Sequence, residues 1–524
     1  MKRSSGVLLH ISSLPGKWGI GKFGKSAIDF AGFLKKAGFS YWQVLPFNPV
    51  GEGNSPYMSF SAFAGYIGFI DPEELVDDGL IYPYEIKIFE YHGSEYLTDY
   101  DFSYSRTLEM LKFAYMRITS ETRSAIAEFS EENKEWLDDY ALFMSLRERE
   151  GNKPFWLWSD PDLVRRDPSA LKSAFSRDKE SIAFWKFAQY IFYRQWFRTK
   201  AAINELGIEM IGDMPIYVSM DSSDVWAHPE YFRLDRDLTP EVVAGVPPDY
   251  FAADGQLWGN PIYDWDKLES DEFKWWTDRI ALSFKSFDHV RIDHFRGFES
   301  FWEVDAKAKT AKTGKWVKGP AMKLFNKVKE VMGEVNIIAE DLGDITDEVV
   351  AFLSESGFPG MKVIQFGFDA SADSPHLPHN HERNCIAYSG THDNNTILGW
   401  LWEASERNRD YALDYCGFHG DWGTGGPFSG SVKAILRTLW QSSADVVIVP
   451  MQDICGFGSD ARMNVPGVPS GNWRFRITGS ALADLPADHW RRQNLVFRRF
   501  LPDNMNKLSD TDDDQTVSAE DYDR

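Results

Sequence analysis

Eight short apolar segments recur along this chain, and most of them run into polar or acidic residues. Segments with helical periodicity, such as residues 321–331 and 347–356, separate most of them. Strands that alternate with helices favour a parallel sheet, and eight such units can close into a barrel. We therefore predict an α/β fold, a (β/α)₈ TIM barrel. The predicted strands are residues 6–11, 40–47, 209–218, 289–294, 335–341, 361–366, 385–393 and 445–453.

Two long stretches between predicted strands interrupt the barrel. Residues 51–206 have a strongly helical texture, and the apolar and aromatic side chains of residues 182–196 recur at three- and four-residue steps, which is typical of a buried helix face. We predict a catalytic barrel over residues 1–500 that is interrupted by this mostly helical insertion and by a second insertion at 219–285. Residues 501–524 are acidic and poor in apolar side chains, so we expect a disordered tail.

Composition argues against several classes of function. The formal net charge is −23 and the isoelectric point about 5, so binding to a nucleic-acid backbone is not expected. No apolar run is long enough to cross a bilayer, and the N-terminal residues are too polar for a signal peptide. Three cysteines in 524 residues are few, which favours a cytoplasmic protein. The 20 tryptophans provide flat apolar rings, which suit the faces of sugars.

One predicted strand carries an arginine beside an aspartate. Val290 and Ile292 alternate with Arg291 and Asp293, so the apolar pair faces one way and the charged pair the other. The adjacent arginine is expected to lower the pKa of the Asp293 carboxyl and to keep it ionised, which suits a nucleophile at the C-terminal end of a strand. The alternative is an ion pair with a purely structural role.

Three acids, Asp293, Glu340 and Asp393, lie at the ends of the fourth, fifth and seventh predicted strands. The C-terminal ends of barrel strands share one rim, so these acids should meet there. Glycosidic cleavage needs an acid that protonates the leaving oxygen and a carboxylate on the other side of the sugar. Asp293 fits the nucleophile. Glu340, which has no adjacent cation in the sequence, fits the acid because neighbouring carboxylates raise its pKa, but spacing alone does not distinguish it from Asp341.

Two other motifs have competing interpretations. Residues 19–26 match both the phosphate-loop pattern and G-x-G-x-x-G, either of which would suit a nucleotide-binding enzyme such as a kinase. A turn at Pro15 and Gly16 separates them from the preceding strand, and no acid ends the next one, so we favour an ordinary loop that enters a helix. The histidines of residues 376–381 have no cysteine or carboxylate ligands with them, so we predict a loop rather than a metal site.

Several longer motifs occur together between about residue 5 and residue 500. They are Asn54-Ser55-Pro56-Tyr57, residues 211–215, residues 245–251 with 255–261, Arg291-Ile292-Asp293-His294-Phe295-Arg296-Gly297, residues 339–343, Gly390-Thr391-His392-Asp393-Asn394 and residues 461–467. In this order they resemble the 4-α-glucanotransferases of the amylomaltase (disproportionating enzyme) type, glycoside hydrolase family 77, which are related to the α-amylases. The resemblance implies a retaining enzyme that transfers an α-1,4-glucan segment from a maltooligosaccharide to the 4-OH of glucose or another glucan, without a metal or cofactor.

The resemblance also implies a role for each site residue. Asp293 would be the nucleophile, Glu340 rather than Asp341 the acid/base, and Asp393 the group that stabilises the transition state. The residues implied for the donor subsite are Asp213, Arg291, His294 and His392, and those implied for flanking glucose units are Tyr57, Tyr250, Gln256, Trp258 and Asn464.

Residues 245–261 are expected to form a loop that arches over the cleft. Ala252 stands where the family is expected to have a serine, which bears on the preferred acceptor. An α-glucan hydrolase is the alternative enzyme. A glucan-binding protein without turnover is the alternative outside enzymes, although the complete trio of acids argues against it.

Overall fold

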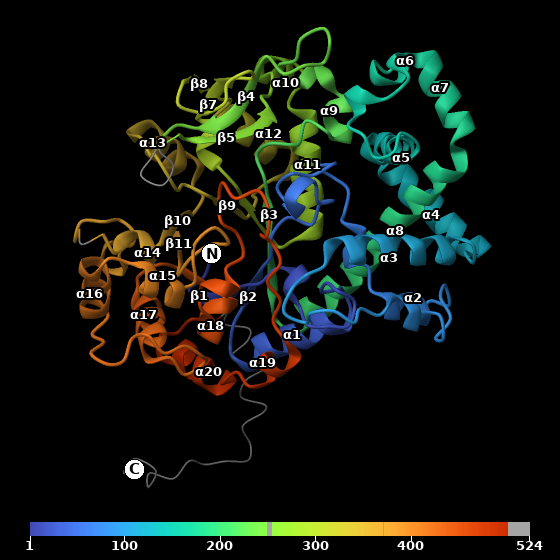
Figure 1. Cartoon of the computed structure of the whole chain (residues 1–524). Helices are drawn as coiled ribbons and strands as arrows, with labels where there is room; N and C mark the ends of the chain where they lie inside the picture. Colours follow the sequence, from blue (N-terminus) through green and yellow to red (C-terminus); the bar gives the residue numbers. More distant parts are fainter. Residues whose placement is uncertain (249–253, 370, 501–524) are drawn as a thin grey trace.

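The computed structural model describes residues 1–248, 254–369 and 371–500, and its centre is a sheet of eight parallel strands (Figure 1). Strands that are neighbours in the sheet follow one another along the chain, apart from the last and the first. The sheet closes into a barrel where the main-chain N–H of Ala339, in one end strand, donates to the oxygen of Pro359, just before the other end strand, at 2.9 Å. The predicted (β/α)₈ barrel is confirmed. In sheet order the strands are β10 (Gly360–Val363), β11 (Cys385–Tyr388), β12 (Val446–Pro450), β1 (Ser4–Leu8), β2 (Tyr41–Gln43), β3 (Glu209–Met214), β6 (His289–Ile292) and β9 (Ile337–Ala339).

Most of these strands are shorter than predicted, and the difference lies mainly at their C-terminal ends. β3 stops at Met214 because the following Pro215 has no N–H for the sheet. β6 ends at Ile292 and β9 at Ala339, so the predicted acids of these strands lie in the loops that follow. The polar ends of the predicted strands therefore belong to the loops on the C-terminal rim.

Helices fill most of the stretch between β2 and β3 and lie together beside the barrel (Figure 1). The longest, α8, has 27 residues, and its Trp185 and Trp196 are buried as the periodicity predicted. Gln189 on the same face donates to and accepts from the main chain of Gly65 at 3.0 and 2.8 Å. These helices are α2 (Pro72–Asp77), α3 (Tyr100–Tyr115), α4 (Ser120–Glu132), α5 (Lys134–Arg149), α6 (Pro161–Val164), α7 (Pro168–Arg177) and α8 (Lys179–Glu205).

A second, antiparallel sheet of four strands stands above the barrel rim, and sequence periodicity did not reveal it. Its order is β5 (Gln256–Pro261), β4 (Val242–Val246), β7 (Ser300–Asp305) and β8 (Gly314–Lys318). The stretch 245–261, which was expected to be a loop, therefore begins with the end of β4 and ends with β5, and these two strands are paired. Tyr250 and Ala252 lie outside the described residues, as does the tail 501–524.

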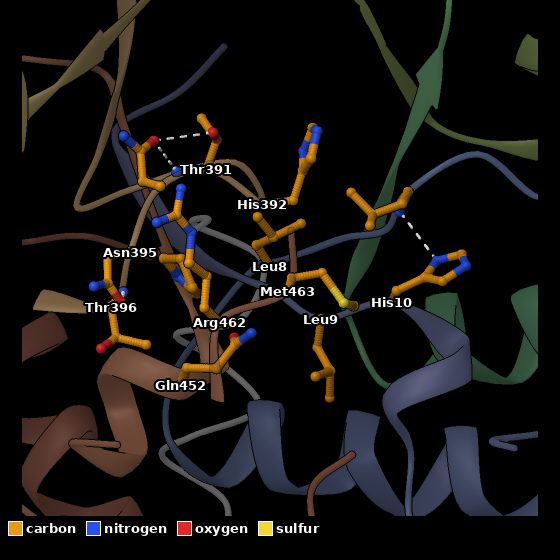
Figure 2. Close-up of a pocket in the computed structure, with 13 residues that line it drawn as sticks. Leu8, Leu9, His10, Thr391, His392, Asn395, Thr396, Gln452, Arg462 and Met463 are labelled. Carbon is orange, nitrogen blue, oxygen red and sulfur yellow. Dashed lines mark hydrogen bonds between the residues drawn. The ribbon is translucent and has the colours of Figure 1, made fainter. Parts of the chain in front are cut away.

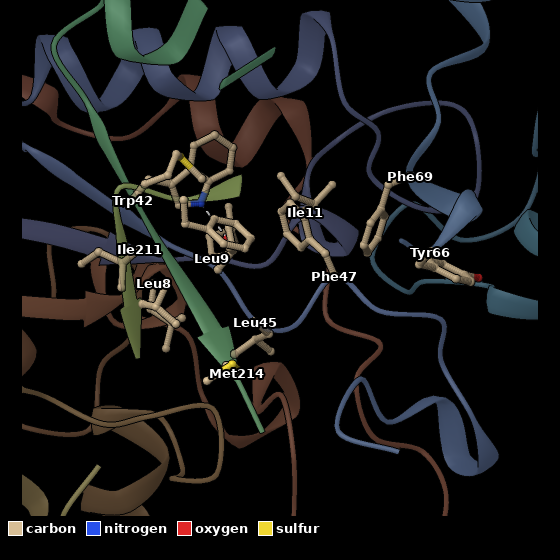
Figure 3. Packing of buried hydrophobic residues seen from close by; sticks show 14 of the residues in the cluster. Leu8, Leu9, Ile11, Trp42, Leu45, Phe47, Tyr66, Phe69, Ile211 and Met214 are labelled. Atoms are coloured by element: carbon tan, nitrogen blue, oxygen red, sulfur yellow. Dashed lines mark hydrogen bonds between the residues drawn. The ribbon is translucent and has the colours of Figure 1, made fainter. Parts of the chain in front are cut away.

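The remaining helices cover the barrel and continue its core. Figure 3 shows apolar side chains of the first three barrel strands, among them Trp42 and Ile211, packed in one region with Phe47 and Phe69 beyond them. No helix in the described ranges has the length and apolarity that a membrane span requires. These helices are α1 (Lys25–Lys36), α9 (Ser223–Ala227), α10 (Trp265–Ser270), α11 (Lys274–Ser286), α12 (Met322–Met332), α13 (Asp347–Ser356), α14 (Ile364–Gly367), α15 (Ile397–Glu403), α16 (Glu406–Tyr415), α17 (Gly430–Gln441), α18 (Met451–Cys455), α19 (Gly479–Ala483) and α20 (Ala487–Val496).

The stretch that mimics a phosphate loop is occupied by the protein's own groups. Gly24 precedes α1 with a φ of 69°, and a Cβ atom there would lie 2.3 Å from the Asp71 carboxylate. A carboxylate at this helix N-terminus takes the place that a phosphate would need and repels it. Lys22 is buried and donates to Gly68 O at 2.6 Å, while Lys25 is exposed and pairs with a neighbouring aspartate. A phosphate loop is therefore excluded.

Burial of Lys22 predicts an unusual dependence of stability on pH. Burial lowers the pKa of its amine to about 7, against an ordinary value of 10.5 in the unfolded chain. Between these values the unfolded chain binds the proton more tightly, so stability should rise with pH. From pH 7 to pH 9, we expect the free energy of unfolding of the wild type to gain about 2 kcal/mol relative to Lys22→Met. Urea denaturation of both proteins at both pH values measures this difference.

Lys25→Met is the matched control, because the exposed Lys25 amine has a raised pKa and stays protonated in both states over this range. Its stability relative to the wild type should not change between pH 7 and pH 9. If the difference in free energy of unfolding between the wild type and Lys22→Met is also the same at pH 7 and pH 9, the prediction is wrong.

Candidate active site

A buried arginine joins two of the predicted site carboxylates. Asp213 on β3 is paired with Arg291 on β6 in the sheet register, which places both on the rim side of the barrel. Arg291 donates through Nη1 to both oxygens of Asp213 at 2.7 and 2.8 Å, and through Nη2 to Asp293 Oδ1 at 2.8 Å. The Asp213 side chain is fully buried, whereas that of Asp293 is 29% exposed and so accessible to a ligand.

Charge pairing compensates the burial of the arginine. Burial lowers the pKa of Arg291, but the Asp213 and Asp293 carboxylates more than offset this effect and raise the pKa well above its ordinary value. Burial raises the pKa of the Asp213 carboxyl, and the Arg291 guanidinium opposes that rise. The arginine is therefore a permanent cation, and its hydrogen bond fixes the orientation of the Asp293 carboxylate.

Tyr57 and His392 complete the buried side of the site. The Tyr57 hydroxyl donates to Asp213 Oδ2 at 2.7 Å and lies 3.3 Å from His392 Nδ1. The two rings stack with centroids 4.9 Å apart and an angle of 22°. Trp473 packs against both, with centroids 5.7 and 5.6 Å away. This stack holds the imidazole of His392 in one place.

Asp393 lies in the loop after β11 and is held by two residues of the later segment 461–467. Its Oδ1 accepts from Asn464 Nδ2 at 2.6 Å and lies 3.3 Å from His392 Nε2. Arg462 donates to its main-chain oxygen at 2.6 Å. The Asp393 side chain is 46% exposed, so its second oxygen is available to a ligand.

Glu340 and Asp341 have different surroundings despite their adjacency. Glu340 accepts main-chain hydrogen bonds from His294 at 2.7 Å and from Leu342 at 2.8 Å, which places its carboxyl beside the loop of Asp293. Asp341 instead accepts from the main-chain N–H of Met361 at 2.5 Å on β10. Geometry therefore places Glu340, and not its neighbour, with the other site residues.

Burial gives Glu340 the properties of a proton donor. Burial, followed by the nearby Asp293 charge, raises the pKa of the Glu340 carboxyl to about 8, while Arg291 and the two main-chain N–H groups act in the opposite direction. The carboxyl is thus protonated at neutral pH. An ionised carboxylate and a protonated carboxyl side by side form the pair that glycosidic cleavage requires.

The remaining predicted residues, His294, Trp258 and Gln256, lie next to the loop of Asp293. His294 has a left-handed backbone with φ 51°, and Trp258 on β5 meets its ring edge to face at 4.9 Å. Trp258 Nε1 donates to Gln256 Oε1 at 3.2 Å. Tyr250 lies outside the described residues, so eleven of the twelve predicted residues are placed, and all of these belong to this one region through the contacts given above.

Two residues of the site were not identified from the sequence. Trp473 supports the ring stack, and Arg462 supports Asp393. Arg462 lies inside the motif of residues 461–467, and Trp473 follows it in Ser470-Gly471-Asn472-Trp473. The density of turn residues around the tryptophan was the available signal, because a large aromatic in a Gly-rich loop commonly anchors that loop.

A separate hollow lies beside these carboxylates. It is open to solvent and is bordered by His392 (Figure 2). His10 also lines it and accepts from the Leu45 N–H through Nδ1 at 3.2 Å. In the described part of the chain its lining residues are Leu8, Leu9, His10, Leu45, Thr391, His392, Asn394, Asn395, Thr396, Pro450, Gln452, Arg462 and Met463, so the three acids stand at its side rather than around it.

The described residues contain no group of three or more histidines, cysteines, aspartates and glutamates placed to hold a metal ion. In the histidine-rich loop, His376 Nδ1 accepts from the Val363 N–H at 3.2 Å and His379 Nδ1 contacts Tyr415 Oη at 2.8 Å. Internal contacts thus occupy these imidazoles. The chemistry of the site rests on carboxylates.

Comparison with known proteins agrees with this chemistry. Residues 9–482 match the family described as 4-alpha-glucanotransferase. The chain is 46% identical over 490 residues to the 4-alpha-glucanotransferase of Thermus thermophilus, which covers 92% of this chain and 96% of that protein. It is 43% identical over 493 residues to that of Clostridium butyricum, with 94% of this chain and 100% of that protein covered.

A solved structure agrees as well. Amylomaltase from Streptococcus agalactiae in complex with acarbose superimposes with a TM-score of 0.91 at 39% identity, over 95% of this chain and 100% of that one. The match covers the barrel, both long stretches between its strands and the rim that carries the three acids. The chain therefore belongs to the 4-α-glucanotransferase family.

Proposed function

We propose that this enzyme transfers an α-1,4-glucan segment from a maltooligosaccharide donor to the 4-OH of glucose or another glucan, by a retaining double displacement at Asp293 and Glu340. One observation carries the proposal. A partly exposed Asp293 is held by the Arg291 cation, and the buried Glu340 carboxyl, with a pKa raised to about 8, is close enough for the Asp293 charge to affect it. This difference between adjacent carboxyl groups is what a retaining mechanism uses.

In the first half-reaction, an Asp293 oxygen forms a bond to C1 of the donor while the bond from C1 to the leaving O4 breaks. The electron pair of that bond goes to O4, which takes the proton of Glu340. In the second half-reaction the acceptor 4-OH attacks C1 and gives its proton to the Glu340 carboxylate. The ester bond breaks, and its electron pair returns to Asp293.

The other side chains bind and orient the sugar. Asp393, held by Asn464, offers a free oxygen to sugar hydroxyls, and these bonds would strengthen as positive charge develops at C1. Asp213, Arg291, His294 and His392 surround the donor glucose in this proposal. Tyr57, Gln256, Trp258 and Asn464 contact the neighbouring units.

Transfer requires that a bound acceptor reacts faster than water. Water is present at roughly 55 M, so the acceptor must be aligned, and effective molarities far above that value are attainable. Trp258 has a partly exposed indole against His294, which can cover one glucose face and exclude water from the ester. We assign acceptor binding to this indole.

Two features of chain organisation support the proposal. The insertion 51–206 supplies Tyr57, and the insertion 219–285 supplies Trp258, so both border one cleft on the catalytic barrel 1–500. All three cysteines have free thiols, which agrees with a cytoplasmic enzyme. Its partners are α-1,4-glucans and glucose.

The first test concerns the nucleophile. Asp293→Asn keeps the shape of the side chain and removes the attacking charge, so kcat on maltotriose should fall by several orders of magnitude while the protein stays folded. Product chain lengths and thermal unfolding measure the two effects. Near-normal turnover, or a trapped glucosyl ester on a peptide outside residues 291–297, would refute the assignment.

The second test separates Glu340 from Asp341. General acid help is worth about 10²–10⁴ in rate and matters most for poor leaving groups. Glu340→Gln should therefore cripple maltotriose cleavage but spare the first step with α-glucosyl fluoride, and Asp341→Asn should do less harm with both. Because Glu340 must be protonated, kcat/KM of the wild type should fall as the pH rises above about 8. If Glu340→Gln loses the same factor in rate with maltotriose and with α-glucosyl fluoride, Glu340 is not the general acid.

The third test concerns Trp258. We expect Trp258→Ala to lower transfer more than donor cleavage, so that the ratio of hydrolysis to transfer rises. Reducing ends and product chain lengths from maltotriose, measured together, give this ratio. Trp156→Ala, at an exposed tryptophan of the helical insertion, is the control and should leave it unchanged. If both activities fall in step in Trp258→Ala, the indole does not discriminate acceptor from water.

A further inference from the structure

Arg296 is a buried cation that takes no part in the steps above. It lies in the 3₁₀ turn η7 (Phe295–Phe298), directly after the loop that follows β6, and only 3% of it is exposed. Its Nη1 donates to the main-chain oxygen of Asp344, and its Nη2 donates to Ser300 Oγ at 3.2 Å. The guanidinium carbon lies 3.8 Å from the centre of the Trp316 ring on β8. A planar cation is thus fixed by two hydrogen bonds and one aromatic face.

These contacts connect the two loops that hydrogen-bond the Glu340 carboxyl. One bond comes from the main-chain N–H of His294, in the same loop as Arg296. The other comes from the N–H of Leu342, in the loop after β9 that also contains Asp344. By holding Asp344, the guanidinium holds the loop of Leu342 against the loop of His294. The carboxyl lies between the two donors.

The loop after β9 needs such a restraint. Gly343, between Leu342 and Asp344, has a φ of 93°, a conformation that glycine adopts freely and that leaves the unrestrained chain many alternatives. The Asp344 carboxylate is 63% exposed and lies 3.9 Å from the guanidinium, so it adds little through charge alone. Main-chain bonds from Phe295 N–H to Glu340 O at 3.0 Å and from Glu340 N–H to Ile292 O at 3.1 Å join the two loops at their starts, and the hydrogen bond from Arg296 to the main-chain oxygen of Asp344 extends this restraint past Gly343.

Arg296 is also expensive for stability. Burial lowers its pKa, and its Nε has no hydrogen-bond partner among the described residues. A buried donor that is left unpaired destabilises the folded state. A cation kept at such a cost has a better explanation in what it positions than in stability.

We propose that Arg296 is a positioning residue for proton transfer, because it clamps together the two loops whose N–H groups orient the Glu340 carboxyl, with Trp316 as the support of the clamp. This inference rests on the proposed acid/base role of Glu340. It adds a residue outside the sugar-binding site to the machinery that the first and second half-reactions use.

Release of the clamp should have a specific effect on Glu340. The two N–H groups lower its pKa against burial and the Asp293 charge, so weaker bonds from them should raise it. The other charged groups are placed independently of the clamp. Arg291 is held by Asp213, and Asp341 is engaged with the Met361 N–H and with Lys362 at 3.3 Å. A change at Arg296 therefore acts on Glu340 through the two loops.

The experiment compares Arg296→Lys, Arg296→Met and Trp316→Leu with the wild type in the full chain. A misplaced acid should lower kcat on maltotriose on the order of 10- to 100-fold, with KM nearly unchanged. The first step with α-glucosyl fluoride should change much less, because its leaving group needs little protonation. The basic limb of the kcat/KM profile should move up by roughly one pH unit. Trp316 is 38% exposed, so Trp316→Leu should fold readily and show the same changes at smaller size.

The lysine variant separates geometry from charge. Lysine keeps the positive charge but lacks the planar fork, so Arg296→Lys should behave like Arg296→Met. Arg476→Lys is the matched control, because Arg476 is also buried and donates to main-chain oxygens, at 2.8 Å to Gly16, but in loops that do not contact Glu340. It should lower the melting temperature without a shift of the basic limb.

Three results would overturn the inference. In the first, Arg296→Lys behaves like the wild type while Arg296→Met shifts the basic limb of the kcat/KM profile. In the second, the variants lose activity equally with maltotriose and with α-glucosyl fluoride. In the third, the basic limb stays in place in every Arg296 and Trp316 variant. Glu340→Gln in the same assays separates this failure from a failure of the proposed function. If that variant loses maltotriose activity selectively while the Arg296 variants do not, only the clamp is wrong.

Discussion

The site depends on one guanidinium between two carboxylates. Arg291 donates to both oxygens of the buried Asp213 and to one oxygen of Asp293. Neither charge could stay buried alone, because removing one partner of a buried ion pair leaves an uncompensated charge that costs several kcal/mol. The parallel register of β3 and β6 places Asp213 opposite Arg291, and a slip by one residue would turn one of them into the hydrophobic layer. Barrel register and site electrostatics are thus a single constraint.

Around this pair, three acids of similar chemistry acquire different properties from their surroundings. Asp293 touches a permanent cation, Glu340 is buried between two main-chain donors, and Asp393 is half exposed and bound to an amide. Desolvation without a direct ion pair keeps one carboxyl protonated, and a guanidinium keeps another ionised. The division of roles between nucleophile and acid in the proposed mechanism follows from these contacts rather than from the side chains themselves.

The segments inserted between the barrel strands contribute side chains that contact these site residues. Tyr57 reaches the site from the first long insertion and Trp258 from the antiparallel sheet, while Trp316 of that sheet supports Arg296. The insertions therefore do more than cover the rim. They supply rings and loop anchors that contact the site residues.

The sequence by itself determined the eight strands, their order and the three acids at their ends, because apolar runs and the polar residues after them are local properties of the chain. It also predicted the buried face of α8. Spacing left the choice between Glu340 and Asp341 open, because adjacent residues after a strand can turn either way, and the motifs implied Glu340. Tertiary structure showed the physical basis, with Glu340 beside the loop of Asp293 and Asp341 bound to β10. It alone showed the sheet of β4, β5, β7 and β8, the stacking of Trp473, and the Asp71 carboxylate in the place of a phosphate. Each of these depends on segments far apart in the chain, and their contacts have no periodicity that a single sequence records.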